Sequence, residues 1–310
     1  MNWLEIFQDP NTQWILLGSM LLGLSSGVIG SFAYLRKQSL MGDALAHAAL
    51  PGVCIAFMIT GTKSILYFLI GAAAAGVLAT FLIGYITRNS RIKQDSALGI
   101  ILTVFFGFGI VLLTQIQHGD SGNQSGLDKF LFGQAASMVQ SDVYTMAIIS
   151  VILVALSFLF FKEFKLLSFD PGFAKGIGLP IMLLDQFIML LIVTAVVVGI
   201  QAVGVVLMAA LLITPAVAAR YWTEKLHIMV MLAGLFGALS GFAGTVISTM
   251  ANNLPTGPLA VLSATAIFVF SVIFAPKRGV IAKSMMQLTA KRDYEKQYAS
   301  QKMKEGSLYE

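Results

Sequence analysis

Long apolar runs, most of them close to the length of one membrane-spanning helix, limit what this chain can fold into. At roughly 20 residues per span, we place the runs at residues 14–35, 40–60, 64–87, 96–117, 143–161, 181–219, 226–250 and 257–275. Only 11% of the residues are charged, and the mean hydropathy is +0.83. Soluble globular domains do not have this composition. We therefore predict an all-α polytopic membrane protein with about eight to nine transmembrane helices.

The run at residues 181–219 is too long for one span and leaves two arrangements open. Its 39 residues fit two crossings with a turn at Gly199–Gly204, or one crossing plus a broken or re-entrant segment. The basic residues favour one topology, because placing Arg36 and Lys37 in the cytoplasm puts 18 of the 20 Lys and Arg there. The run must then enter and leave by the same face of the membrane. We expect a multi-pass protein of the cell membrane, with the N-terminus outside and the C-terminus cytoplasmic.

The net charge of +5 follows from this asymmetry between the two faces, so we expect contact with the lipid bilayer and no nucleic-acid partner. The single cysteine, Cys54, excludes an intramolecular disulfide. Small residues four positions apart, such as Gly23 with Gly27 and Gly237 with Gly241, allow close helix packing. We expect these glycines to pack helices within the chain.

Asp43 and His47 are ionisable residues inside the apolar run at residues 40–60. Residues four apart share one face of a helix, and a carboxylate and an imidazole are both good ligands for a divalent cation. Ionisable side chains at membrane depth are costly, so they mark ion or substrate paths. The predicted role is a metal site, for which manganese or iron suits the ligands and zinc is acceptable. The alternative is a polar pair that serves only packing.

A divalent ion takes about four to six ligands, whereas one chain supplies two strong ligands here. A two-fold axis through the site doubles that number, so the residues favour a homodimer. Other polar residues are weaker candidates. We expect Cys54 to be a small buried residue, His118 and Asp120 to lie in a solvated loop, and Asp185 to pair with a nearby Lys or another polar group.

The segment His118–Gln140, on the outer side, begins polar and rich in glycine and ends apolar. Its apolar half is too short to span a membrane, so we predict an interfacial or re-entrant element.

The segment Ser168–Pro180, on the inner side, predicts a short cytoplasmic helix. Asp170 is suited to the N-cap and Pro171 to the first helical position. The helix would present Phe169 and Phe173. It either connects two spans or docks into a partner.

Four segments, in the same order along the chain, resemble the ABC-3 metal permeases, the membrane subunits of bacterial manganese, zinc and iron ABC importers. They are Met41–Gly52, Phe169–Pro180, Ile213–Ala216 and Ala275–Lys277. The resemblance covers about residues 14–280, and residues 126–136 further resemble the manganese-type members. We therefore treat residues 1–280 as a transmembrane permease domain and residues 281–310 as a basic cytoplasmic tail.

The resemblance implies a homodimer, cytoplasmic ATP-binding subunits and an extracellular metal-binding protein as partners. It implies no cofactor beyond the transported divalent ion, with manganese favoured. Asp43 and His47 match the family's metal-coordinating pair. The residues that match the family's coupling helix, which docks on the ATPase, are Phe169, Asp170, Pro171, Phe173, Ala174, Lys175 and Gly176.

Two other classes of protein are alternatives to an ABC permease. A gradient-driven secondary metal transporter would use Asp43 as a proton or sodium site, but it has no need of a docking helix. An intramembrane metalloenzyme would need a third metal ligand, and the sequence has no His-Glu-x-x-His motif. The chain also lacks a phosphate-binding loop of the Gly-x-x-x-x-Gly-Lys-Ser/Thr type. We therefore expect no enzyme activity, and ATP hydrolysis by a partner subunit.

Overall fold

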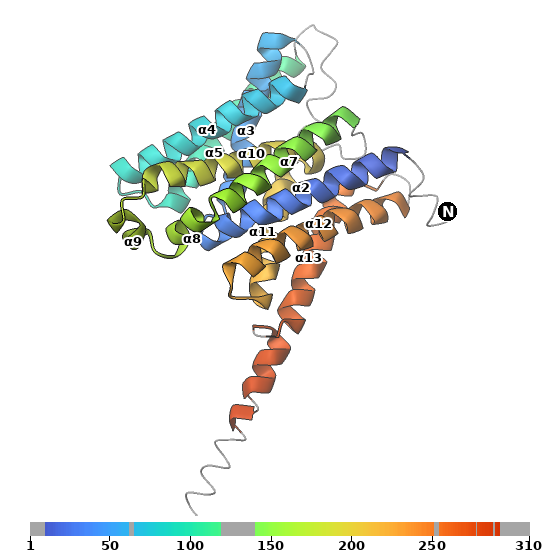
Figure 1. Cartoon of the computed structure of the whole chain (residues 1–310). Helices are drawn as coiled ribbons and strands as arrows, with labels where there is room; N and C mark the ends of the chain where they lie inside the picture. Colours follow the sequence, from blue (N-terminus) through green and yellow to red (C-terminus); the bar gives the residue numbers. More distant parts are fainter. Residues whose placement is uncertain are drawn as a thin grey trace, which may run out of the picture.

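The computed structural model describes residues 10–61, 65–118, 140–250, 254–276, 278–287 and 289–291, which form helices and turns without strands. The all-α prediction is confirmed (Figure 1). The helices are α2 (Pro10–Leu35), α3 (Met41–Thr60), α4 (Ile65–Asn89), α5 (Gln94–Gln117), α7 (Gln140–Leu159), α8 (Phe161–Phe169), α9 (Pro171–Gly176), α10 (Ile181–Val203), α11 (Val205–Trp222), α12 (Leu226–Met250) and α13 (Thr256–Phe274). The element predicted within His118–Gln140 lies almost wholly outside the described residues.

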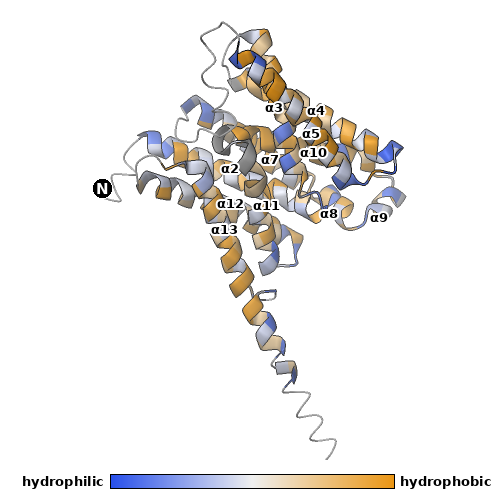
Figure 2. Cartoon of the chain, turned by 180° about the vertical axis from the view of Figure 1, so that it is seen from behind, coloured by the Kyte–Doolittle hydropathy of each residue, from blue (hydrophilic) through white to orange (hydrophobic). Residues whose placement is uncertain are grey.

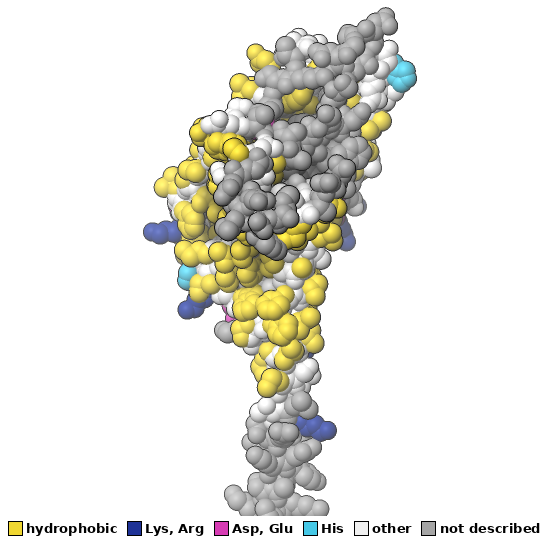
Figure 3. All heavy atoms as spheres, turned by 90° about the vertical axis from the view of Figure 1, so that its right-hand side faces the viewer, with side chains coloured by type: hydrophobic (Ala, Val, Ile, Leu, Met, Phe, Trp, Pro, Cys, Tyr) yellow, Lys and Arg dark blue, Asp and Glu magenta, His cyan; other side chains and the backbone are white. Residues whose placement is uncertain are grey.

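Eight of the described helices are long and apolar enough to cross a membrane. The apolar part of α11, Met208–Trp222, is shorter than the other spans. Hydrophobic residues cover these helices along most of their length, and hydrophilic residues gather at turns such as those beside α9 (Figure 2). In the space-filling view, the described surface is mostly hydrophobic, with a few Lys and Arg at its margins (Figure 3). The polytopic prediction is confirmed.

Helix α2 packs antiparallel against α12 through glycines. A Cβ atom built on Gly237 would lie 1.9 Å from the carbonyl oxygen of Gly23, and one built on Gly27 would lie 2.1 Å from that of Ala233. These distances leave no room for any side chain, so the two backbones touch. The small-residue spacings therefore serve packing within the chain, as expected.

The run at residues 181–219 forms two helices, α10 and α11, which are separated at Gly204, where φ is +89°. Glycine adopts this angle without steric cost. Near the start of α10, Asp185 forms an ion pair with Arg36, directly after α2. Near the end of α11, Ala219 belongs to a cluster that packs against Tyr34, close to the same end of α2. The run therefore enters and leaves at one end of the bundle, as the basic residues predicted.

We call this end of the bundle, at which α2, α4, α7, α11 and α13 end and α3, α5, α10 and α12 begin, the Arg36 end. Helices α8 and α9 lie there, between α7 and α10. Each described Lys and Arg before residue 277 lies on or beside a turn at the Arg36 end. Beyond α13, the described part of the tail, residues 278–287 and 289–291, leads away from the bundle (Figure 1). The cytoplasmic location of the tail stays a prediction.

Candidate metal site and docking helix

Asp43 and His47 lie in the first two turns of α3, on one face, as their spacing predicted. Asp43 Oδ1 and His47 Nε2 are 3.5 Å apart, which is long for a good hydrogen bond. The Asp43 side chain is 41% exposed and that of His47 is 18% exposed. The two atoms are therefore close enough to bind one ion together, and no strong hydrogen bond between them competes with the ion.

The imidazole of His47 is held by α5. Its ring meets Phe106 edge to face, with centroids 4.7 Å apart and planes at 77°. Its Nδ1 atom is buried and has no hydrogen-bond partner among the described residues. Because buried polar atoms are nearly always paired, this nitrogen indicates a partner group outside the described residues.

The pair is partly buried and lies nearer to the Arg36 end of the bundle than to the other end. The neighbouring Gly42 packs against Leu212 of α11, and the carbonyl oxygen of Leu212 abuts Gly30 of α2. Gly30 precedes the end of α2 by five residues, or roughly 8 Å along the axis. Among the described residues, no group of three or more His, Cys, Asp or Glu side chains is placed to hold a metal ion. One copy of the chain thus offers two ligands.

The weaker candidates do not join this pair. Cys54 is fully buried, and its Sγ donates to the carbonyl oxygen of Gly109 on α5 at 3.8 Å, as expected for a packed residue. His118 caps the far end of α5, where its Nδ1 donates to the carbonyl oxygen of Thr114 at 2.8 Å. Asp120 lies outside the described residues. The partner of Asp185 is Arg36 and not a lysine.

The predicted short helix is α9, and its N-cap is confirmed. Asp170 Oδ1 accepts a hydrogen bond from the backbone N–H of Phe173 at 2.9 Å, and Pro171 occupies the first helical position. The side chains of Phe169, Phe173 and Ile177 are 55%, 57% and 56% exposed. Ile177 was not predicted, although its spacing of four from Phe173 places both residues on one face of a short helix.

Among the seven residues predicted for docking, Ala174 alone is buried. The carbonyl oxygen of Ala174 accepts a hydrogen bond from the N–H of Leu179, which fixes the turn that leads into α10. Lys175 and Gly176 are exposed. Helix α9 is therefore anchored on its inner side and apolar on its outer side.

The tertiary contacts of Arg36 and Phe106 were not predicted either. Arg36 was interpreted as a topology anchor, and it does mark one end of the bundle, but it also pairs with Asp185 at a distance of 149 positions in the sequence. Phe106 is one of 22 phenylalanines in an apolar chain, and nothing in its sequence context singles it out. Both roles depend on tertiary contacts.

Comparisons with known proteins agree with this architecture. The family model described as "ABC 3 transport family" matches residues 8–275. The chain is 58% identical over 290 residues to the manganese transport system membrane protein MntC of Bacillus subtilis, across 94% of this chain and 66% of that protein. It therefore spans just under two thirds of that relative's length. It is 47% identical to the zinc transport system membrane protein TroC of Treponema pallidum, across 90% and 93% of the two chains.

A solved structure described as PsaBC from Streptococcus pneumoniae in complex with Fab matches with a TM-score of 0.79 and 34% identity, over 89% of this chain and 96% of the other. An inward-facing metal-chelate type ABC transporter shares the fold, with a TM-score of 0.64 and 17% identity. The chain therefore belongs to the ABC 3 transport family, as a membrane-spanning permease subunit whose transport depends on ATP hydrolysis by a separate subunit.

Proposed function

We propose that two copies of this chain form the membrane path of an ATP-driven importer of divalent metal, with manganese as the ion carried. In this proposal Asp43 and His47 of each copy coordinate the ion. The observation that carries the proposal is the geometry of this pair: two candidate ligand atoms lie 3.5 Å apart in a partly buried position, and the other ring nitrogen of His47 is buried with no partner among the described residues.

The ligand number supports the two-fold arrangement. One copy offers a single carboxylate and a single imidazole, and the described residues contain no larger ligand group. A second copy related by a two-fold axis supplies the same two side chains again, which brings the set within the range that divalent ions require. The exposed fraction of Asp43 leaves its carboxylate accessible to such a partner.

The chemistry of the ligands and the names of the relatives together favour manganese. Carboxylate oxygen suits manganese, whereas imidazole suits both zinc and iron. The relative with 58% identity is named for manganese transport and the relative with 47% identity for zinc transport. A mixed set of this kind is suited to manganese and accepts zinc as a competitor.

Helix α9 would couple ATP hydrolysis in the partner subunit to transport. Phe173 of α9, Phe169 at the end of α8 and Ile177 directly after α9 form an exposed apolar surface at the Arg36 end. We propose that this surface docks on a cytoplasmic ATP-binding subunit. The Arg36 end would then face the cytoplasm, in line with the basic residues gathered there, and the N-terminus would lie outside. A separate metal-binding protein would deliver the ion at the opposite end.

The test is uptake of manganese into vesicles that hold the chain with its ATP-binding subunit and binding protein. Wild type is compared with Asp43→Ala and with the matched control Asp95→Ala, which removes an exposed carboxylate from the first turn of α5. We expect ATP-dependent uptake that Asp43→Ala abolishes and Asp95→Ala retains, with both complexes assembled. Full uptake by Asp43→Ala would contradict the assignment of the metal site. Uptake that does not require ATP but depends on a proton gradient would favour a secondary transporter.

A further inference from the structure

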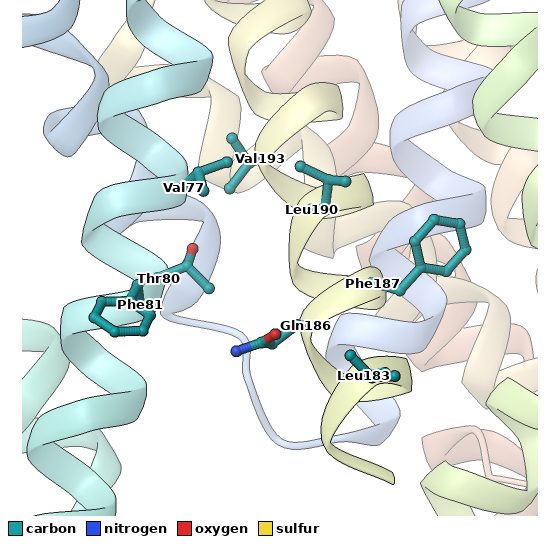
Figure 4. Close-up of a pocket in the computed structure, with 8 residues that line it drawn as sticks. All are labelled: Val77, Thr80, Phe81, Leu183, Gln186, Phe187, Leu190 and Val193. Atoms are coloured by element: carbon teal, nitrogen blue, oxygen red, sulfur yellow. The ribbon is translucent and has the colours of Figure 1, made fainter. Parts of the chain in front are cut away.

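A continuous cleft runs between α4 and α10, from the middle of the bundle to its Arg36 end. Two adjoining cavities of about 320 and 210 Å³ form it, and they share Thr80, Phe81 and Gln186. In the inner cavity, Val77 and Val193 approach each other from the two helices, while Thr80 and Gln186 extend into the space between them (Figure 4). No part of the proposed transport mechanism uses this cleft.

The lining changes from apolar to polar along the length of the cleft. Its inner part is lined by Val77, Leu190 and Val193, whereas Arg88 and Asn89 line the part at the Arg36 end. Eleven positions separate Val77 from Arg88 on α4, which is roughly 17 Å along a helix. The hydrocarbon core of a bilayer is about 30 Å thick. The cleft therefore spans about the depth of one leaflet, with its polar end toward the membrane surface.

The polar end carries a net positive charge. Asp185 lines it too, but Arg36 neutralises that carboxylate in an ion pair. The guanidinium of Arg88 has no acidic partner within ion-pair distance among the described residues. An anionic group at this end of the cleft would therefore meet an uncompensated cation.

The middle of the cleft offers neutral hydrogen-bonding groups. The amide of Gln186 makes no hydrogen bond with the described residues, and the figure shows it directed toward α4 (Figure 4). Thr80 Oγ1 donates to the carbonyl oxygen of Gly76 at 2.9 Å, which leaves its lone pairs free to accept. An uncharged polar group that lies between a phosphate and an acyl chain, such as a glycerol ester, suits this position.

We propose that this cleft binds one anionic phospholipid from the leaflet at the Arg36 end. Arg88 binds its phosphate, Gln186 donates to an ester carbonyl, and one acyl chain lies along Val77 and Leu190, which are 46% and 43% exposed. The order of cation, amide and apolar surface along the cleft matches the order of groups in a phospholipid. Because α10 follows directly after α9, a lipid held here also stabilises the position of α10 against α4. This inference does not depend on which ion the protein carries.

The experiment uses the full-length chain in vesicles of equal phosphatidylglycerol and phosphatidylcholine, extracted in mild detergent and weighed by native mass spectrometry. We expect wild type to retain phosphatidylglycerol in preference to phosphatidylcholine. Arg88→Gln should lower that retention about fivefold, whereas Arg91→Gln, three residues further on and outside the cleft, should not. Val77→Phe, which fills the inner part, should also lower retention. Its control is Val151→Phe on the exposed surface of α7, where Val151 is 62% exposed.

Equal retention of the two lipids by wild type, or retention unchanged in both Arg88→Gln and Val77→Phe, would overturn the proposal. A second copy of the chain is the other occupant to test. Because Cys54 is buried, a cysteine introduced by Leu183→Cys at the exposed rim is the one accessible thiol among the described residues. Disulfide-linked dimers of this variant in the same vesicles would place another copy over the cleft and would also overturn the proposal, and monomers would support it.

Discussion

Arg36 and Asp185 form an ion pair that joins the turn between α2 and α3 to the first turns of α10. The side chains are 14% and 24% exposed, so the pair is shielded from most of the solvent. Arg36 precedes α3 by five residues, and Asp185 follows α9 by nine. The pair therefore joins the turn that leads into α3, the helix proposed to bind metal, to α10, which follows the proposed docking helix α9 after a turn of four residues.

Replacing Asp185 with Asn should destabilise the chain and weaken this link. The variant leaves the Arg36 guanidinium in a largely buried position without its counter-charge, which costs about 1–3 kcal/mol. We expect a lower thermal unfolding midpoint in detergent and less metal moved per ATP hydrolysed. The exchanged pair Arg36→Asp with Asp185→Arg should recover part of both losses. Equal values for the single and exchanged variants would show that the two residues do not act on each other.

The ligand chemistry of the α3 pair predicts a change in metal preference. Asp43→His replaces the carboxylate with a second imidazole, which suits zinc better than manganese. In the uptake assay we expect the ratio of zinc to manganese transport to rise, even where total transport falls. A ratio equal to that of wild type would show that Asp43 does not contact the ion. Asp95→Ala serves again as the control and should leave the ratio unchanged.

The sequence predicted the membrane-spanning helices and α9, and the end at which each begins, because both are set by local patterns, whereas α8 was not predicted. The apolar runs define the spans. The basic residues require the run at residues 181–219 to enter and leave by the same face of the membrane, and the structure shows two antiparallel helices there, which separate at Gly204. Partners across helices were not predictable in this way. Asp185 was expected to pair with a nearby lysine or another polar group, and its partner, Arg36, lies far away in the sequence and close only in the folded bundle.

The contact between α2 and α12 should not tolerate even one added methyl group. Gly237→Ala places a Cβ 1.9 Å from the carbonyl oxygen of Gly23, so the two backbones must separate. Overpacking of this kind costs about 1–3 kcal/mol. We expect a lower thermal unfolding midpoint for the purified chain. The matched control is Gly107→Ala on α5, where a Cβ meets no atom within 4 Å, and this variant should unfold no earlier than wild type.

The apolar surface of α9 predicts loss of the ATPase when it is made charged. Phe173 is 57% exposed and makes its cap contact through the backbone N–H, so Phe173→Asp should leave α9 folded. We expect the variant to lose co-purification with the ATP-binding subunit, and with it ATP-dependent uptake. Ser90→Asp adds the same charge at an exposed turn of the Arg36 end and should retain the subunit. An intact and coupled complex with Phe173→Asp would exclude α9 as the docking element.

The pair proposed to bind metal shows what the sequence could predict and what it could not. The four-residue spacing correctly placed Asp43 and His47 on one face of α3, because helix geometry is local. Phe106, which holds the imidazole, and Leu212, which fixes the depth of the pair in the bundle, come from α5 and α11. Their positions follow from how the helices pack, which no pattern within α3 encodes.

The orientation of the bundle in the membrane can be tested with single cysteines. Because Cys54 is buried against Gly109, it should not react with a membrane-impermeant maleimide, and an introduced cysteine then reports its own side. Ser90→Cys, at the Arg36 end, should be protected in intact cells and labelled in inside-out vesicles. His118→Cys, at the exposed far end of α5, should show the reverse. Labelling of Ser90→Cys from outside would invert the orientation and would place the apolar surface of α9 out of reach of any cytoplasmic ATPase.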